Sequence, residues 1–476
     1  MTSQLDQTAP PQSRLRDRAL RAAGWTFGAY GGQLAVRLLS NLILTRLLFP
    51  EAFGAVAAAM ALISGLVLVS DFGVHVVIIQ SPRGDQVAFL RSAWVFQVSR
   101  GVALWLILVA LCILISTPMI RNLLPAASIF ADRSFPIITA SMGFVIVLDG
   151  ARSTCIPLNA RRLNYRPTVV VNLSARILSL PVMFIWAWIA PSVWALVGGG
   201  LAASLFALVL SHAVVPGPRM GLNWEKDHLQ EIVRFGRWIA VSSFGTFISQ
   251  QSDVILLGIL MPSSFLGLYS IAKLLVSIGE GLLEQLNGSL ALPILGEVIR
   301  KDPNNVRDRY YRYRLPIEIS AGLLSGGLFA TGIFVVNFLY DTRYAQAGFM
   351  LQILALGTVI YPILIIRDAF IATGNTHISA ALSVLQATSL IVCVLIGFFA
   401  FGALGAIGGV ALHRIIPSLV TVFLARQRNW IWISRELRII PAFVIGILVG
   451  KGIVLIAHTF GLVNVHQFFH SKAFGG

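Results

Sequence analysis

The residues that could do chemistry in this sequence are charged side chains inside long apolar runs. Two of them, Arg37 and Arg414, fall near the middle of their runs. A charge at the centre of a membrane-spanning helix costs at least about 2.5 kcal/mol on insertion scales, so it needs a partner, a water-filled cavity or a function. The basic residues in such runs are Arg37, Arg100, Arg176, Lys273, Arg414 and Lys451.

Basic residues spread over at least five apolar runs predict an internal cavity of positive charge, whose ligand is anionic. The guanidinium group of arginine is planar and binds two oxygens at once, which suits phosphate. A diphosphate head group is therefore the natural candidate ligand, whereas organic cations would need a cavity of opposite charge. The residues expected to form this site are Arg37, Arg100, Arg176, Lys273 and Arg414.

Acidic residues in the same runs have two interpretations, and the sequence leaves both open. They could be counter-ions of the basic residues, or they could couple transport to an ion. The candidates are Asp71, Asp253, Glu280 and Glu284. The spacing of Lys273, Glu280 and Glu284 places them on one helical face, which should point inward. A third interpretation is that all these charges are ion pairs that hold helices together.

The elements that must position these charges are membrane-spanning helices. The chain of 476 residues is 57% hydrophobic and only 12% charged, and its mean hydropathy is +0.81. Soluble proteins carry about 25% charged residues, so lipid must cover much of this surface. Apolar runs of about 20 residues predict spans. They lie near 22–48, 54–80, 90–115, 135–156, 167–189, 192–214, 235–260, 264–292, 314–340, 346–370, 377–400 and 404–425, with a thirteenth near 438–460.

The distribution of basic residues predicts the orientation of these spans. If the N-terminus is cytoplasmic, the inner loops hold about five times as many of the 36 Lys and Arg residues as the outer loops. We therefore expect a multi-pass protein of the cell inner membrane with a cytoplasmic N-terminus. The net charge of +16 then reflects topology and contact with anionic lipid, and no nucleic acid is expected as a partner.

Two function classes are disfavoured by the same layout. No G-x-x-x-x-G-K-[ST] phosphate loop is present, so this chain is not expected to hydrolyse ATP. The outer loops are short, which argues against a membrane-embedded transferase or polymerase. We expect no enzyme activity, no cofactor and no metal site.

Two segments of the chain read alike. The first has Gly24-Trp25, then Gly54, and then Asp71, 17 residues after that glycine; the second has Gly236, then Gly267, and then Glu284 at the same spacing. Two ordinary helical hairpins could also give this pattern. A true repeat, offset by six spans, predicts two lobes related by a parallel pseudo-two-fold axis, with a site between them.

The expected fold is thus an all-α polytopic membrane protein with two six-helix lobes and a C-terminal thirteenth span. The expected parts are a cytoplasmic tail (1–21), an N-terminal lobe (22–214), a cytoplasmic linker (215–234), a C-terminal lobe (235–425) and a C-terminal span and tail (426–476).

The stretch 39–54, LSNLILTRLLFPEAFG, resembles the first hairpin of Wzx-type polysaccharide flippases. Ser70-Asp71-Phe72-Gly73, Ile79-Gln80 and Gly374-Asn375 fit the same family, whose superfamily also holds MATE multidrug exporters and lipid II flippases. The match is sharpest over 24–100. A thirteenth span departs from the twelve or fourteen of many members, so the C-terminus is either periplasmic or re-enters the membrane.

The resemblance implies that the chain moves undecaprenyl-diphosphate-linked oligosaccharide units from the cytoplasmic to the periplasmic leaflet by alternating access. It implies two six-helix lobes around a central cavity, and a polysaccharide polymerase and chain-length or export proteins as partners. The alternative is a MATE-type secondary exporter of small molecules, which an acid-rich cavity would favour.

Overall fold

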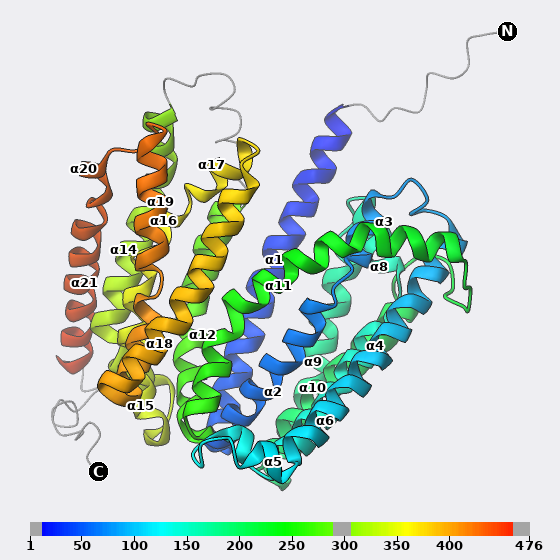
Figure 1. The fold of residues 1–476 in the computed structure, drawn as a ribbon, viewed down its shortest axis with the longest axis horizontal. Helices are drawn as coiled ribbons and strands as arrows, with labels where there is room; N and C mark the ends of the chain where they lie inside the picture. Colours follow the sequence, from blue (N-terminus) through cyan, green and yellow to red (C-terminus); the bar gives the residue numbers. More distant parts are fainter. Residues whose placement is uncertain (1–11, 289–305, 460–476) are drawn as a thin grey trace. The chain divides into compact units, whose positions relative to one another are not determined.

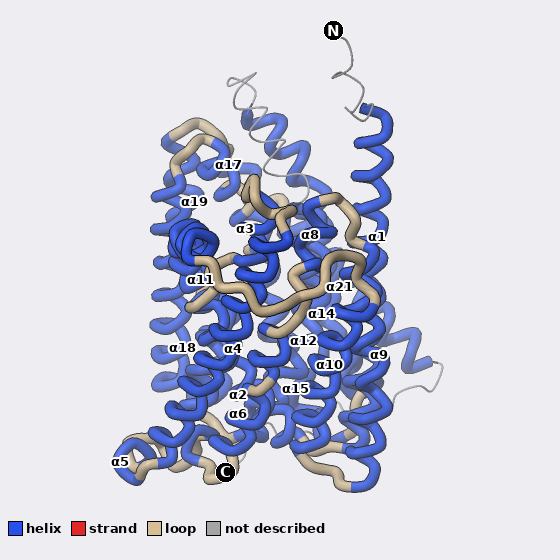
Figure 2. The backbone as a smooth tube through the Cα atoms, turned by 90° about the vertical axis from the view of Figure 1, so that its right-hand side faces the viewer, coloured by secondary structure: helices blue, strands red, loops and turns tan. Residues whose placement is uncertain are grey.

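The computed structural model describes residues 12–288 and 306–459, and every regular element in these ranges is a helix (Figures 1 and 2). The chain divides into two compact units. Unit 1 comprises Met1–Phe247 with Gly258–Ser263, and unit 2 comprises Ile248–Leu257 with Ser264–Gly476. The helix α11 (Lys226–Leu260) contributes residues to both units.

Unit 1 is built from long helices and short connecting ones. They are α1 (Gln12–Leu47), α2 (Pro50–Val69), α3 (Val74–Gln80), α4 (Val87–Ser116), α5 (Pro118–Arg121), η1 (Ile129–Ala131), α6 (Phe135–Gly143), α7 (Val145–Gly150), α8 (Cys155–Arg161), α9 (Arg166–Ile189) and α10 (Val193–Ala213). Helix α9 packs against α10 and α1, and α4 packs against α6 and α7. A Cβ on Gly101 would lie 2.9 Å from the Ile146 carbonyl oxygen, so glycine is what lets α4 and α7 approach so closely.

Two of the expected spans in unit 1 are broken. The run expected over 54–80 is apolar from Pro50 to Gln80 but stops being helical between α2 and α3. Gly73 has a φ of 58° there, and its N–H donates to Asp71 Oδ1 over 2.9 Å. The run expected over 135–156 is divided among α6, α7 and α8, with a bend of 55° between Phe135–Gly150 and Cys155–Arg161.

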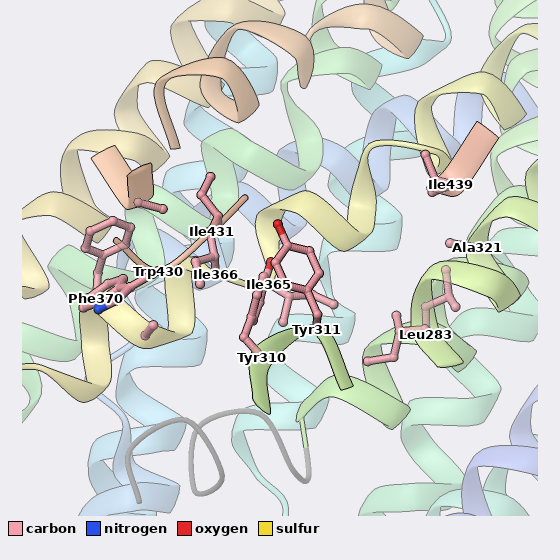
Figure 3. Close-up of a cluster of buried hydrophobic side chains, with 13 residues drawn as sticks. Leu283, Tyr310, Tyr311, Ala321, Ile365, Ile366, Phe370, Trp430, Ile431 and Ile439 are labelled. Atoms are coloured by element: carbon pink, nitrogen blue, oxygen red, sulfur yellow. The ribbon is translucent and has the colours of Figure 1, made fainter. Parts of the chain in front are cut away.

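Unit 2 contains the remaining helices. They are α12 (Ser263–Gly288), α14 (Val306–Leu339), η3 (Thr342–Tyr344), α15 (Ala345–Thr358), α16 (Tyr361–Leu364), α17 (Arg367–Ala372), α18 (Thr376–Leu412), α19 (Ile415–Gln427), α20 (Ile433–Glu436) and α21 (Ile439–Thr459). A buried cluster surrounds Tyr310, Tyr311 and Trp430 and joins the start of α14 to α16, α17 and the segment after α19 (Figure 3).

Helix α18 folds back on itself at Phe401 and Gly402, where the backbone leaves the helical conformation and Gly402 has a φ of 63°. The two arms then run antiparallel, because contacts form between positions equidistant from Phe401. A Cβ on Gly405 would lie 2.0 Å from the Gly397 carbonyl oxygen, and Ser389 Oγ donates to the His413 carbonyl oxygen over 2.7 Å. The spans expected over 377–400 and 404–425 are the arms of this hairpin.

The thirteenth apolar run, expected over 438–460, is the helix α21, which packs along α14. Glycines on both helices make the contact. A Cβ on Gly326 would lie 2.1 Å from the Phe443 carbonyl oxygen, and one on Gly450 would lie 2.8 Å from Ala330 Cβ. Residues later in α14 contact residues later in α21, so the two helices are parallel. Small residues repeated every four positions allow this close approach between helices in lipid.

Among the described residues, nine segments are long and apolar enough to cross a membrane, or ten if the bent pair in α6–α8 is one span. The segment His377–Gln427 is counted once there and holds both arms of the hairpin. Helices α1 and α11 cover the spans expected over 22–48 and 235–260 and lie outside this count.

The chain is therefore a multi-pass α-helical membrane protein. The thirteen-span layout and the lobe boundaries at 214 and 235 stay predictions. Most of the N-terminal tail and everything after residue 459 lie outside the described residues.

Candidate functional site

Arg37 on α1 and Arg176 on α9 lie close enough in unit 1 for their positive charges to repel. Both side chains are exposed in this structure. No carboxylate in residues 12–288 or 306–459 forms an ion pair with either guanidinium. Two neighbouring guanidinium groups that lack a carboxylate partner in the described ranges are a candidate binding site for an anion with several oxygens.

Arg100 on α4 is held by neutral acceptors at the end of α2. Its Nη2 donates to the Val67 carbonyl oxygen over 2.7 Å and to Ser70 Oγ over 3.1 Å. Carbonyl groups at a helix C-terminus lack helical partners and carry partial negative charge, which a cation stabilises. Asp71 also attracts Arg100, although no direct hydrogen bond joins them among the described residues. Arg100 therefore secures the break between α2 and α3.

Lys273 on α12 forms an ion pair with Asp253 on α11, with Nζ and Oδ2 separated by 2.6 Å. Asp253 is 5% exposed. The Tyr269 hydroxyl donates to the same carboxylate oxygen, and Lys273 Nζ also donates to the Gln250 carbonyl oxygen over 3.2 Å. The other oxygen of Asp253, Oδ1, is buried and has no hydrogen-bond partner in the described part of the chain.

Arg414, between α18 and α19, donates to both carboxylate oxygens of Glu280 on α12. Its Nη1 lies 2.5 Å from Glu280 Oε1 and its Nη2 lies 3.3 Å from Oε2. Both side chains are about one fifth exposed. The bidentate geometry makes this a strong pair, and it joins α12 to the hairpin.

Glu284 and Arg414 line a cavity of about 300 Å³ in unit 2. Three further polar residues of this cavity come from α12 and α17. Arg367 donates to Gln386 Oε1 over 2.9 Å and to Ser383 Oγ over 2.6 Å, while Asp368 accepts from Asn287 Nδ2 over 3.1 Å. Arg367 is not among the site residues predicted from the sequence. The signal was its position in an apolar run immediately after Tyr361-Pro362, where the helix is interrupted.

The predicted basic residues are thus distributed over both units. Arg37, Arg100 and Arg176 lie in unit 1, and Lys273 and Arg414 lie in unit 2. The predicted face of α12 is divided: Lys273 and Glu280 each form an ion pair, and Glu284 lines the cavity. Asp71 accepts a hydrogen bond from the N–H of Gly73, immediately before α3. Within the described ranges, no group of three His, Cys, Asp or Glu residues could hold a metal ion.

The sequence pattern of a known family, described as "Polysaccharide biosynthesis protein", matches residues 43–348. This match covers more than half of the chain, including the first hairpin, the break at Asp71 and the helix α12. The chain belongs to this family. The sequence resemblance to Wzx-type flippases is thereby confirmed at the family level.

Two curated relatives belong to polysaccharide pathways. One is the succinoglycan biosynthesis transport protein ExoT of Rhizobium meliloti (strain 1021), 23% identical over 71% of this chain and 65% of its own length. The match therefore spans slightly less than two thirds of that protein. The other is the lipopolysaccharide biosynthesis protein WzxC of Escherichia coli (strain K12), 20% identical over 86% of this chain and 81% of its own.

Solved structures share the fold of this family member. The lipid II flippase MurJ in an inward closed conformation has a TM-score of 0.64 and 15% identity, and the match covers 95% of this chain and 100% of MurJ. An inward-facing multidrug resistance MATE transporter of the MOP superfamily has a TM-score of 0.62 and 14% identity, covering 82% and 94%. These likenesses establish the fold.

Proposed function

We propose that this chain is a flippase that moves undecaprenyl-diphosphate-linked oligosaccharide units from the cytoplasmic to the periplasmic leaflet for surface polysaccharide synthesis. The observation that carries the proposal is the pair of unneutralised guanidinium groups of Arg37 and Arg176 in a member of a polysaccharide biosynthesis family. A diphosphate is an anion with many oxygens, and it matches two neighbouring guanidinium forks.

The basic residues of the two units have different parts in this proposal. Arg37 and Arg176 receive the diphosphate directly, and Arg100 holds the end of α2 at the break before α3. Lys273 and Arg414 bind Asp253 and Glu280 as counter-ions, and exchange these carboxylates for phosphate oxygens as the substrate passes. Such an exchange keeps the buried charges compensated at each stage of alternating access. Asp71 and Glu284 occupy matching positions of the repeat and act as further counter-ions or as an ion-coupling pair.

The repeat itself is supported by two matching turns. Leu163 and Gly374 both have positive φ, of 57° and 77°. Each is followed by an asparagine whose N–H donates to the carbonyl oxygen five residues earlier, Asn164 to Asn159 and Asn375 to Phe370. This is the Schellman pattern of a helix C-terminus. Both turns follow a broken span and precede a long apolar hairpin, which supports two six-helix lobes.

We place the protein in the inner membrane with a cytoplasmic N-terminus, twelve core spans and a thirteenth. The parallel packing of α14 and α21 supports this layout, because the ninth and thirteenth spans must then run in the same direction. The layout predicts a periplasmic C-terminus. Alkaline phosphatase fused after Gly476 should be active in intact cells, and a fluorescent protein that matures only in the cytoplasm should stay dark at the same position.

Loss of this chain tests the function. A deletion strain should stop exporting polymer and accumulate lipid-linked repeat units that a membrane-impermeant probe does not reach. The bilayer supplies the lipid carrier, and a polymerase with chain-length or export proteins would use the flipped units. Normal polymer output in the deletion strain would refute the proposal.

A MATE-type exporter of small molecules is the second candidate. Four carboxylates within unit 2, namely Asp253, Glu280, Glu284 and Asp368, favour it, because acidic residues suit cationic substrates. Under this alternative the deletion strain would become sensitive to cationic drugs and dyes while its polymer output stayed normal.

A further inference from the structure

A second cavity of about 300 Å³ lies in unit 1, and its chemistry is unlike that of the arginine pair. Four turns of the chain meet around it: the α1–α2 turn, the segment from η1 to α6, the α9–α10 turn and Ser263 after α11. With the predicted cytoplasmic N-terminus, each of these turns lies on the outer side of the membrane. The Ser128 hydroxyl donates to the Gly258 carbonyl oxygen over 3.1 Å, which ties η1 to the end of α11.

The cavity has an apolar floor and a polar rim. Leu48, Ile129 and Phe135 form part of the floor and are almost fully buried. The rim carries two carboxylates, Glu51 and Asp132, and the hydroxyl groups of Ser134, Ser192 and Ser263. Asp132 Oδ1 accepts from the N–H and the hydroxyl of Ser134 over 2.8 and 2.9 Å, so this side of the rim is held in place. No lysine or arginine in the described ranges lines the cavity.

We propose that this cavity is a subsite for uncharged sugar rings on the outer side of unit 1. Carboxylates accept strong hydrogen bonds from neighbouring hydroxyl groups, serine hydroxyls donate and accept, and the apolar C–H faces of a sugar ring pack on an apolar floor. Two carboxylates without a basic residue repel phosphate and acidic sugars. A volume of about 300 Å³ lies at the lower end of the range for small-molecule sites.

The position of the cavity fits the substrate class of the proposed function, on which this inference rests. Leu48 follows the last residue of α1 and lies 11 residues after Arg37, a separation of about 16 Å at helical rise. A diphosphate at Arg37 and a sugar chain that extends along α1 would therefore place a distal sugar in the cavity. Unit 1 would then bind the anionic diphosphate at a basic site and a neutral sugar at an acidic site.

Saturation-transfer NMR on the full-length protein in lipid nanodiscs tests the subsite. The probes are methyl α-D-glucopyranoside, methyl β-D-galactopyranoside and methyl N-acetyl-β-D-glucosaminide, with methyl β-D-glucuronide as the acidic comparison. We expect transfer to at least one neutral glycoside and several-fold weaker transfer to the glucuronide. Ala52→Phe fills the cavity and should abolish the signal, whereas Val56→Phe, one turn further along α2 and outside the lining, should keep it.

Glu51→Gln supplies a second variant with nearly unchanged shape. Loss of one hydrogen bond to a charged group should weaken the affinity for the neutral glycoside about tenfold. No transfer to any neutral glycoside, or equal transfer in the wild type, Ala52→Phe and Glu51→Gln, would overturn the subsite. This failure is distinct from that of the flippase proposal, because accumulation of lipid-linked units in the deletion strain is measured without reference to the cavity.

Discussion

Arg37 and Arg176 of unit 1 lie together without a carboxylate in the described ranges, whereas Lys273 and Arg414 of unit 2 each hold one. Sequence position alone makes these residues equivalent, since all are basic side chains inside apolar runs. In the structure, these residues differ in the partner that each one has. A substrate can bind the arginines of unit 1 without displacing a protein group, but it must break an ion pair to reach Lys273 or Arg414.

This difference indicates which residues act on substrate and which also stabilise the fold. Removing one member of a buried ion pair leaves an uncompensated charge and is strongly destabilising, whereas removing an unpaired charge is not. The contrast can therefore be tested by measuring export and stability on the same set of variants.

The largest expected effect is on export, in the double variant Arg37→Ala and Arg176→Ala. Each guanidinium that loses its hydrogen bonds to phosphate should cost about tenfold in rate, so export should fall about 100-fold. The free energy of unfolding should change by less than about 0.5 kcal/mol, because neither side chain leaves a buried carboxylate unpaired. Polymer released per cell and thermal unfolding in detergent measure the two quantities. Lys451→Ala, an exposed basic residue on α21, is the matched control and should export normally. Full export in the double variant would refute a diphosphate site at these positions.

The next effect is on stability, in the variant Glu280→Ala. This change leaves Arg414 unpaired and should cost about 3 kcal/mol, the low end for buried pairs, because both side chains retain some exposure. Adding Arg414→Ala should recover much of the loss, and a double-mutant cycle measures the coupling. Glu284→Ala, one turn along α12, should cost far less, since Glu284 is exposed. Equal losses for Glu280→Ala and Glu284→Ala would contradict the contrast between the units.

The smallest effect concerns the neutral acceptor of Arg100. Ser70→Ala removes the acceptor of two Arg100 hydrogen bonds, from Nε and Nη2, and should destabilise the protein by about 1 kcal/mol, because the Val67 carbonyl oxygen still accepts. Ser64→Ala on the same helix is the control, since that hydroxyl donates only within α2, to the Ala61 carbonyl oxygen. Thermal unfolding of the two variants should differ by this amount. A loss at Ser70 as large as that at Glu280 would mean that unit 1 also depends on its charge partners.

The spans could be predicted from the sequence because hydrophobicity is a local property. The runs over 167–189, 192–214 and 438–460 match α9, α10 and α21 closely. The breaks at Asp71 and between α6 and α8 were not predicted. An apolar run is equally hydrophobic whether straight or bent, and a break depends on which groups replace its lost hydrogen bonds, as Asp71 and Arg100 do.

That the chain lies in lipid, and which basic residues stand within apolar runs, could be predicted because both follow from residue type and spacing. Which charges meet depends on how the helices pack. Glu280 and Arg414 are 134 residues apart, and whether they touch depends on the rotation and packing of α12 and the hairpin. The partner of each buried charge is a property of the fold, and that partner separates the arginines of unit 1 from the ion pairs of unit 2.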